Sequence, residues 1–508
     1  MSEALDRQER AAHRGEMDLC SVPPASLSHI AFSFTNHCNL RCVYCPQGTH
    51  PDEFHAETPR EQIEKIIDYA IGNGIAKVSI GYYGETMLVK GWEKAVEPLF
   101  GRGIRLNLVS NFSRVMTPEE VAAVSRFDEV QISIDSVDVA VLRQVRKAVD
   151  ARTILYNTHL IRAHAIRHQL PMPQIIWTAV LTDRVAEGMP DLVAMAISSG
   201  VRFINCVEVA YIASDDRREI RHLVDAPDDL FARGFEAVHQ ARRLALLNGV
   251  TFALGGAERM DRRARSLFRP EVRRRIVRTF NGFRDLDPDQ PVFIYGAGSV
   301  GRSLRAALPN GRVSAFIDSN RDGELDGLPV LSFERYRSQA SPEDMILIAS
   351  SFEAEIEKGL LEHGFENYCC LRKADIPETP AEASHVQRQG IQGDYFFSGD
   401  SLDAVPSGMT RLCETPWTEM FLDPKGEAYA CCFRGEVMGR LRNGVEIDDI
   451  MAGEPYRRLR RELLSGEGLN PECRLCSAHP AVTPQAMQEH VRRLLHSRAG
   501  AGEKLSTR

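Results

Sequence analysis

Three cysteines lie close together near the N-terminus, in the segment FSFTNHCNLRCVYCPQG of residues 32–48. Cys38, Cys42 and Cys45 follow the spacing C-x3-C-x2-C. Thiolates this close can bind three irons of one cubane 4Fe–4S cluster and leave its fourth iron without a protein ligand, whereas the ferredoxin runs of four cysteines close the cluster. A zinc site is the alternative, but zinc sites normally show paired C-x2-C units and this segment has only one.

The cysteine motif directly follows an apolar segment, 30–34, that is expected to form a strand. The motif and this setting resemble the radical SAM superfamily, in which the open iron binds the amino and carboxylate groups of S-adenosylmethionine (SAM) and passes an electron into its sulfonium. The resemblance implies a SAM-binding 4Fe–4S cluster on Cys38, Cys42 and Cys45, with Tyr44 beside the adenine. In such enzymes the cofactors carry the difficult chemistry and the protein positions them.

Composition limits the class of protein. The chain has 508 residues, enough for about three domains. Its hydrophobic content of 43% and charged content of 26% are ordinary for a soluble globular protein, and its net charge of −8 makes nucleic acid an unfavoured partner. No apolar run approaches the roughly 20 residues of a membrane span, and the polar N-terminus lacks a signal core. We expect a cytoplasmic protein without a membrane partner, in which clustered cysteines are metal ligands rather than disulfides.

Apolar segments alternate with helical patterns between residues 28 and 255, which predicts parallel strands joined by helices. One expected helix covers 59–73, with Thr58 as its cap and Glu61 three residues further on. Six strands with helical crossovers match the partial (β/α)6 barrel of radical SAM enzymes, where the chemistry gathers at the carboxyl ends of the strands. The expected strands are 30–34, 76–80, 105–109, 129–134, 175–181 and 203–209.

Polar residues stand at the ends of these strands. In GYYGETML, Gly84 and Glu85 resemble the Gly-Gly-Glu motif that binds the amino group of SAM, although Tyr83 replaces the first glycine. Either Arg143 or Arg146 is expected to hold the SAM carboxylate through a charge-assisted pair. The other candidates for SAM contact, by the same resemblance, are Ser110, Asn111, Ser133 and Asp135.

Cys206 lies inside FINCVEV, an expected strand of the barrel. A buried structural cysteine is the commonest fate of a free thiol. The alternative is a thiol that faces the substrate and gives a hydrogen atom to a carbon radical. Radical SAM enzymes that invert a carbon centre use such a cysteine, so Cys206 is the candidate catalytic residue.

The segment PVFIYGAGSVGRSLRAAL of residues 291–308 contains G-x-G-x-x-G between an expected strand and a helix. Gly296, Gly298 and Gly301 allow a tight turn in which backbone amides approach a diphosphate at the helix N-terminus. A second strand ends at Asp318, about 20 residues beyond the glycines, as the motif requires. FIDSNRDGELDGLPVL resembles the Rossmann-like N-terminal domain of sugar acyltransferases, which implies a bound nucleotide or nucleotide sugar. A scaffold without ligand is the alternative.

Cysteines also gather near the C-terminus, in the order C-x12-G-x4-C followed by C-x2-C. LDPKGEAYACC predicts a hairpin with Gly426 in its turn, and EPYRRLRRELLSGE predicts an amphipathic helix. The pattern resembles the SPASM/twitch extension of radical SAM enzymes, in its shorter form with one auxiliary 4Fe–4S cluster. The Gly-x4-Cys spacing nominates Cys431 and leaves Cys432 spare. A structural zinc is the alternative. The expected ligands are Cys413, Cys431, Cys473 and Cys476.

The combined prediction is an α/β protein with a partial (β/α)6 radical SAM barrel, an inserted small Rossmann-like domain and a C-terminal SPASM/twitch iron–sulfur domain. The expected boundaries are 1–27 for a flexible leader, 28–255 for the barrel, 256–289 for a helical linker, 290–375 for the Rossmann-like domain, 376–405 for a second linker, 406–482 for the SPASM/twitch domain and 483–508 for a polar helical tail.

The predicted function follows from these resemblances. A 5′-deoxyadenosyl radical would remove hydrogen from a carbohydrate or aminocyclitol-type substrate, with an electron donor such as flavodoxin or ferredoxin as partner. Epimerisation is expected if Cys206 returns the hydrogen, and dehydrogenation if the auxiliary cluster takes a second electron. A maturase that modifies a ribosomal peptide is a further alternative, although no winged-helix peptide-binding segment is seen. A nucleotide-binding regulator with structural zinc would require the first cysteine motif to be inert.

Overall fold

The computed structural model describes residues 18–21, 27–147, 149–207, 220–268, 279–280, 290–308, 311–341, 344–371, 405–431, 435–474, 476, 479 and 481–505. The chain divides into two compact units. The first unit consists of Met1–Val180, Asn205–Ile220 and Phe397–Arg508, and the second of Leu181–Ile204 and Arg221–Phe396. None of the helices in the described part of the chain is long and apolar enough to span a membrane.

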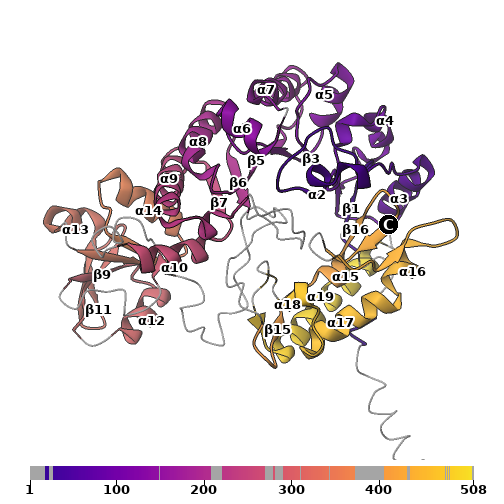
Figure 1. Ribbon diagram of the computed structural model, residues 1–508. Helices are drawn as coiled ribbons and strands as arrows, with labels where there is room; N and C mark the ends of the chain where they lie inside the picture. Colours follow the sequence, from indigo (N-terminus) through magenta and orange to yellow (C-terminus); the bar gives the residue numbers. More distant parts are fainter. Residues whose placement is uncertain are drawn as a thin grey trace, which may run out of the picture. The chain divides into compact units, whose positions relative to one another are not determined.

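The first unit contains a parallel sheet in which each strand pairs with the next along the chain (Figure 1). β1 and β2 are buried at every position, as expected for a sheet covered on both faces. The parallel strands predicted from the alternating pattern are therefore confirmed, with ends that shift by one or two residues. These strands are β1 (His29–Phe32), β2 (Lys77–Ile80), β3 (Arg105–Ser110), β4 (Glu129–Ser133) and β5 (Gln174–Val180).

Helices connect these strands, and their apolar residues pack on the sheet. In α3 (Arg60–Gly72) the buried residues recur at helical spacing, at Ile63, Ile66, Ile67 and Ala70. The prediction that Thr58 caps this helix is wrong, because its hydroxyl donates to the carbonyl of Ser33 at 2.6 Å and Pro59 occupies the cap. The other connecting helices are α2 (Pro46–Thr49), α4 (Trp92–Ala95), α5 (Pro118–Val124), α6 (Val139–Val145) and α7 (Ala151–Arg167).

The C-terminal segment extends the same sheet. β16 (Glu419–Leu422) runs parallel to β1, with His29 opposite Glu419 and Phe32 opposite Leu422. β17 (Glu427–Tyr429) returns antiparallel to β16 and pairs with β18 (Gly439–Arg440), which confirms the predicted hairpin. Gly426 takes φ 76° in the turn, and an added Cβ there would lie 2.5 Å from the carbonyl of Leu441. Only glycine fits this turn.

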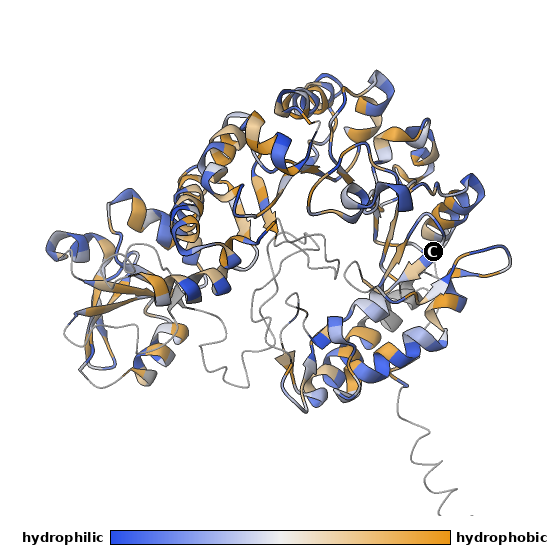
Figure 2. Ribbon diagram, in the orientation of Figure 1, coloured by the Kyte–Doolittle hydropathy of each residue, from blue (hydrophilic) through white to orange (hydrophobic). Residues whose placement is uncertain are grey.

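Helices complete the C-terminal domain. α17 (Glu454–Ser465) mixes hydrophilic and hydrophobic residues along its length (Figure 2) and buries Tyr456, Leu459 and Leu463, which confirms the predicted amphipathic helix. The remaining elements of the domain are β15 (Thr410–Arg411), α15 (Thr415–Thr418), α16 (Ile447–Met451), α18 (Pro471–Arg474), β19 (Ala481–Val482) and α19 (Pro484–Leu505).

Two described segments near the ends of the chain contact the C-terminal domain. The expected polar tail is α19, which buries Met487 and Val491 and donates from Gln488 to the carbonyl of Leu464 at 3.0 Å. In the expected leader, Trp417 Nε1 donates to the carbonyl of Leu19 at 2.7 Å. In the tail, buried apolar side chains make this contact, and near the N-terminus a hydrogen bond to the backbone makes it. The linker 376–405 lies, except for Val405, outside the described residues.

The second unit contains another sheet, in the order β11-β12-β10-β9-β13-β14-β8. β9, β10, β12, β13, β14 and β8 pair in parallel, while β11 is antiparallel to β12. The predicted order of strand, glycine turn, helix and strand is confirmed. The strands are β8 (Thr279–Phe280), β9 (Val292–Tyr295), β10 (Val313–Asp318), β11 (Gly323–Leu325), β12 (Leu328–Ser332), β13 (Met345–Ile348) and β14 (Tyr368–Leu371), and the helices between them are α12 (Ser299–Ala307), α13 (Phe333–Gln339) and α14 (Glu353–Glu362).

Two helices expected within the barrel, α8 (Met189–Ser198) and α9 (Asp228–Leu247), belong to the second unit. Arg242 on α9 donates to both carboxylate oxygens of Glu357 on α14, at 2.5 and 2.7 Å. Glu357 is buried, so this bidentate pair would leave a costly unpaired charge if it separated. β6 (Phe203–Val207) is divided between the units. α10 (Ala257–Leu267) confirms a helix in the predicted linker 256–289.

Candidate functional site

The first cysteine motif forms a tight loop between β1 and α2 (Pro46–Thr49). Within it, Cys45 N donates to the carbonyl of Cys42 at 3.2 Å, and Gly48 N donates to that of Cys45 at 2.9 Å. An added Cβ at Gly48 would lie 2.3 Å from the carbonyl oxygen of Cys42. Because backbone leaves no room for a side chain there, Gly48 permits the loop to turn back and gather the thiols.

The three thiols are electrostatic neighbours. Burial raises the pKa of Cys38 to about 11, and the charge of Cys45 adds to this effect. Burial likewise raises the pKa of Cys42 to about 12, with contributions from Cys45 and Cys38. In the metal-free protein Cys38 and Cys42 therefore hold their protons at neutral pH, and metal binding must release them.

Neighbouring residues contact the thiols. Leu40 N donates to Cys38 Sγ at 3.4 Å, and Asn111 Nδ2 lies 3.7 Å from the same sulfur. The structure thus brings Asn111, a predicted SAM-site residue, to the cysteine loop. Cys45 Sγ donates to Gln47 Oε1 at 2.7 Å. Gln47 was not predicted from the sequence, although it follows the motif by only two residues.

Gly84 and Glu85 connect the cysteine loop to the strand ends. Gly84 takes φ 66°, and an added Cβ would lie 2.4 Å from the carbonyl of Thr35. The buried carboxylate of Glu85 accepts from Ser110 Oγ at 2.8 Å, from Asn111 N at 2.8 Å and from Met87 N at 3.0 Å. Glu85 therefore links the ends of β2 and β3. Its predicted contact with the amino group of SAM stays a prediction.

A second set of predicted residues meets at Asp135. Arg146 Nε donates to Asp135 Oδ2 at 2.6 Å, the Tyr44 hydroxyl donates to the same oxygen at 2.6 Å, and Val180 N donates to Oδ1 at 2.7 Å. Arg143, the other candidate, is exposed. Because Asp135 neutralises Arg146, the arginine is held in a buried position. Its predicted contact with the SAM carboxylate, and that of Ser133 at the end of β4, stay predictions.

This network is attached to the cysteine loop. Val43 N donates to the carbonyl of Val145 at 2.9 Å, at the end of α6 where Arg146 is the C-cap. Burial, the largest effect, raises the pKa of Tyr44 well above its usual value, so that its hydroxyl keeps the proton it donates to Asp135. These hydrogen bonds therefore connect the loop, α6 and the segment that follows β4.

Cys206 is fully buried in β6. Burial raises the pKa of its thiol to about 12, and the charge of Asp135 adds to this effect. The structure thus places Cys206 within electrostatic reach of the Asp135 network. At neutral pH it is a thiol with its hydrogen in place. Its predicted catalytic role stays a prediction.

The second cysteine set lies in the C-terminal domain. Cys413 follows β15, Cys431 follows β17, and Cys473 lies in α18 with Cys476 just after it. Cys413 Sγ is 3.1 Å from the hydroxyl of Thr415, and burial raises the pKa of Cys413 to about 11. Cys432 lies outside the described residues, so the expected choice of Cys431 as ligand stays a prediction.

Arg411 supports this second set and was not predicted. Its side chain is buried, and its guanidinium donates to the carbonyls of His479 at 3.0 Å and Arg474 at 2.9 Å. Burial lowers the pKa of Arg411, and the nearby Cys476 and Cys473 oppose that effect. An arginine two residues before Cys413 was the only signal in the sequence.

Both cysteine sets lie within segments that match known protein families. The family described as the Radical SAM superfamily matches residues 32–173, and the SPASM family, described as an iron-sulfur cluster-binding domain, matches residues 413–477. This chain contains a radical SAM domain and a C-terminal SPASM domain. The first match includes Cys38, Cys42 and Cys45, and the second begins at Cys413 and extends beyond Cys476.

The curated relatives match this chain over part of their length. A probable GTP 3′,8-cyclase of Pyrococcus abyssi is 29% identical over 139 residues, 26% of this chain and 45% of that protein. The GTP 3′,8-cyclase of Petrotoga mobilis is 30% identical over 117 residues, 22% of this chain and 36% of that protein. This chain thus spans less than half of either relative.

Solved structures of low sequence identity also match. Streptococcus suis SuiB bound to S-adenosylmethionine is 10% identical, with a TM-score of 0.43 over 85% of this chain and 68% of that chain. BtrN in complex with AdoMet and 2-DOIA is 11% identical, with a TM-score of 0.30 over 88% of this chain and 92% of that chain.

The donor sets of both domains fit iron–sulfur clusters. The radical SAM domain presents three neighbouring thiols, and the SPASM domain presents four half-buried cysteines with a buried arginine beside two of them. Soft thiolates are the ligands that such clusters prefer. Cys38, Cys42 and Cys45 would therefore hold a cluster with one open iron, and the C-terminal cysteines a second cluster.

Proposed function

We propose that this chain is a radical SAM enzyme that removes hydrogen from a C–H bond of a carbohydrate or aminocyclitol-type substrate. The gathering of Cys38, Cys42 and Cys45 in one loop at the carboxyl end of β1 carries the proposal. When bound, a 4Fe–4S cluster with SAM at its open iron supplies a 5′-deoxyadenosyl radical.

The surrounding residues would hold this loop in place. Asn111 places an amide donor near Cys38 Sγ, while Glu85 fixes Asn111 through its backbone N–H at 2.8 Å. Asp135 and Arg146 pair in the interior, and Asp135 accepts the hydrogen bond that orients Tyr44. These residues preorganise the site rather than exchange protons with the substrate.

We propose epimerisation as the reaction, with Cys206 as hydrogen donor. After hydrogen is removed from the substrate carbon, the S–H bond of Cys206 breaks homolytically. Its hydrogen atom forms a new C–H bond on the face of that carbon opposite to the one that lost hydrogen. One electron from a flavodoxin- or ferredoxin-type donor and one proton then return the sulfur to a thiol. The raised pKa of Cys206 supports this role, because a thiolate would have no hydrogen to give.

Dehydrogenation of an alcohol to a ketone is the second candidate. The four C-terminal cysteines favour it, because a cluster fully ligated by protein can accept an electron without binding substrate. In this case Cys206 is only part of the core. Both reactions begin with the same hydrogen removal, so they differ only in the fate of the substrate radical.

Formation of 5′-deoxyadenosine by the reduced, reconstituted full chain tests the proposal. We expect SAM cleavage by the native chain and none by a variant with Cys38, Cys42 and Cys45 all changed to Ala. Cleavage above background by that variant would contradict the assignment. Incubation in deuterated water with nucleotide sugars and aminocyclitols then separates the reactions, because deuterium enters at the carbon that lost hydrogen only if an exchangeable thiol returns the hydrogen. GTP is included because the curated relatives are named for it.

A further inference from the structure

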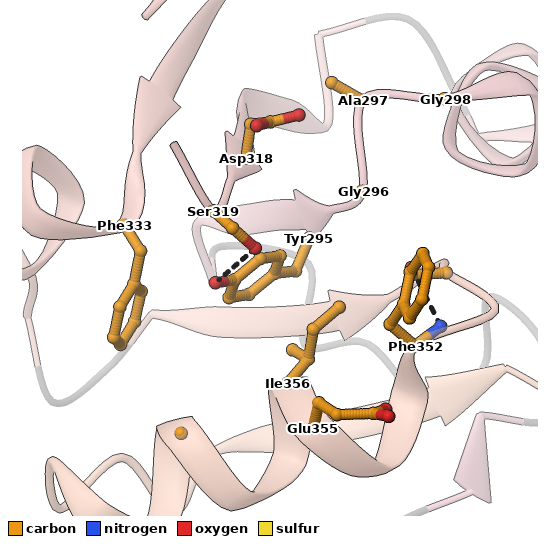
Figure 3. A pocket seen from close by; sticks show the side chains of 12 residues that line it. Tyr295, Gly296, Ala297, Gly298, Asp318, Ser319, Phe333, Phe352, Glu355 and Ile356 are labelled. Atoms are coloured by element: carbon orange, nitrogen blue, oxygen red, sulfur yellow. Dashed lines mark hydrogen bonds between the residues drawn. The ribbon is translucent and has the colours of Figure 1, made fainter. Parts of the chain in front are cut away.

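A pocket of about 440 Å³ opens in the second unit, at the carboxyl ends of its parallel strands (Figure 3). Its walls come from the end of β9, the glycine turn, the end of β10, and the segment that joins β13 to α14. The predicted residues Gly296, Gly298 and Asp318 all line it. The proposed radical chemistry uses none of them.

The pocket lies where the strand order reverses. From β9 the chain builds β10 and β12 on one side of the sheet, and then returns to build β13 and β14 on the other side. In open parallel sheets, ligands bind in the crevice outside the carboxyl ends of the strands at such a switch point. Tyr295, Asp318 and Ser350, which line the pocket, follow or end the three central strands.

The glycines differ in what they do. An added Cβ at Gly301 would lie 1.8 Å from the carbonyl of Gly296, and one at Gly296 would lie 2.3 Å from that of Ala349. These two glycines are therefore required for packing. Gly298 has no atom within 4 Å of an added Cβ, so its missing side chain leaves open space at the pocket. It precedes the first turn of α12, whose backbone N–H groups have no partner within the helix.

Charged groups stand on both sides of this open space. Arg321 donates to the carbonyl of Ala297 in the glycine turn at 3.2 Å, and to Asp318 Oδ2 at 3.2 Å. A cation is thus held next to the N-terminus of α12, which favours an anionic phosphate. The carboxylate of Asp318 lines the pocket next to the turn, and that of Glu355 lines it on the side away from the turn; both can accept hydrogen bonds from hydroxyl groups (Figure 3).

An aromatic ring at the edge of the pocket remains uncovered. Phe333, on one side, packs against Tyr295 and Phe365, with ring centroids 5.7 and 5.9 Å apart. Phe352 also lines the pocket (Figure 3). Its side chain is exposed, with 66% of its surface accessible. A planar base stacked on such a ring is stabilised without a specific hydrogen-bond pattern.

We propose that this pocket binds a nucleoside diphosphate or its sugar conjugate. The diphosphate lies over Gly298 at the N-terminus of α12 near Arg321, the ribose hydroxyls bind Asp318, and the base stacks on Phe352. The cavity with its aromatic edge carries the inference, and the helix end alone would not. Binding here is independent of the proposed SAM cleavage.

Calorimetry on the full reconstituted chain, without SAM or reductant, tests this site. ADP, GDP and UDP are the probes, with inorganic pyrophosphate for comparison. We expect saturable binding of at least one nucleotide, and binding of pyrophosphate weaker by about tenfold or more. Gly298→Val should weaken nucleotide binding by about tenfold or more by filling the open space. Gly323→Val is the matched control, because that exposed glycine of β11 also has free space and lies outside the pocket.

Phe352→Ala provides a second variant that does not depend on the backbone of the turn. It should weaken nucleotide binding by about tenfold and leave pyrophosphate binding unchanged. Absence of saturable heat with all three nucleotides would overturn the proposal, as would pyrophosphate binding as tight as theirs. Full binding by both Gly298→Val and Phe352→Ala would also overturn it. Because the measurement needs no SAM cleavage, failure here leaves the proposed radical chemistry untouched.

Discussion

Arg146 and Asp135 form an ion pair in which the guanidinium donates twice to the carboxylate, from Nε at 2.6 Å and from Nη2 at 3.3 Å. Asp135 is fully buried and Arg146 is only 5% exposed. Two opposite charges with this geometry can remain in a low-dielectric interior, whereas either one alone could not. The pair thus explains how a charged arginine persists beside the cysteine loop.

Removing one charge of this pair should destabilise the protein strongly. We expect Asp135→Asn to lower the free energy of unfolding by about 3–5 kcal/mol, because Arg146 would be left buried without its counter-charge. Tyr44→Phe should cost only about 1 kcal/mol, since it removes a single hydrogen bond and preserves the pair. Denaturant unfolding of the metal-free chain measures both. The exposed pair of Glu97 and Arg126 is the control, because Glu97→Gln should change stability by less than about 1 kcal/mol. An equal decrease in the free energy of unfolding for all three variants would show that the buried pair contributes no more to stability than an exposed pair.

Two clusters should be present in each chain. Anaerobically reconstituted protein should contain about eight irons, and a variant with Cys473 and Cys476 both changed to Ala about four. The reason is that the two cysteine sets lie in separate domains and each supplies ligands to one cluster. Iron and zinc analysis makes the measurement. About four irons and one zinc in the native chain would show that the C-terminal site is structural.

Replacement of Cys206 separates the two proposed reactions. Cys206→Ser should retain 5′-deoxyadenosine formation and lose the inverted product, because an O–H bond is too strong to give up hydrogen to a carbon radical. Product analysis by mass spectrometry and NMR measures this. Cys369→Ser is the matched control, since Cys369 is also a buried thiol but belongs to the sheet of the second unit. Turnover at the native rate in Cys206→Ser would leave the thiol with a packing role and favour dehydrogenation.

His222 should make the second unit sensitive to acid. Burial, with a smaller effect of Arg259, lowers the pKa of His222 from 6.5 to about 4, and its Nδ1 accepts from Val224 N at 3.1 Å. Between pH 6.5 and 4, His222 is therefore protonated in the unfolded chain but still neutral in the folded chain. The free energy of unfolding consequently falls as the pH falls. The loss approaches roughly 3 kcal/mol at pH 4.

Urea unfolding at pH 7 and pH 4.5 measures this dependence. His222→Asn should flatten it, because asparagine keeps an acceptor for Val224 N but does not titrate. His159→Asn is the control, since His159 is exposed and its replacement should leave the dependence unchanged. An equally steep loss of stability in His222→Asn would assign the acid sensitivity to other groups.

The spacing of residues within short segments was sufficient to predict the cysteine motif, the glycine turn and the amphipathic helix of this protein. The interval between Cys38 and Cys45, the glycines around Gly298 and the apolar period of α17 are properties of short segments, and each is recognisable without the structure. The strands β1 to β5 were also predicted to within one or two residues, because a buried parallel strand requires a run of apolar side chains.

The tertiary structure decided which distant segments meet. The sequence did not predict that β16 pairs with β1 across nearly 400 residues, that Asp135 neutralises Arg146, or that Arg411 lies beside Cys473 and Cys476. It also did not assign α9 to the unit that contains α14. A chemical motif depends on residues that are neighbours in the sequence. In contrast, the packing of the whole chain determines which residue pairs with a buried charge and which strand pairs with an open sheet edge.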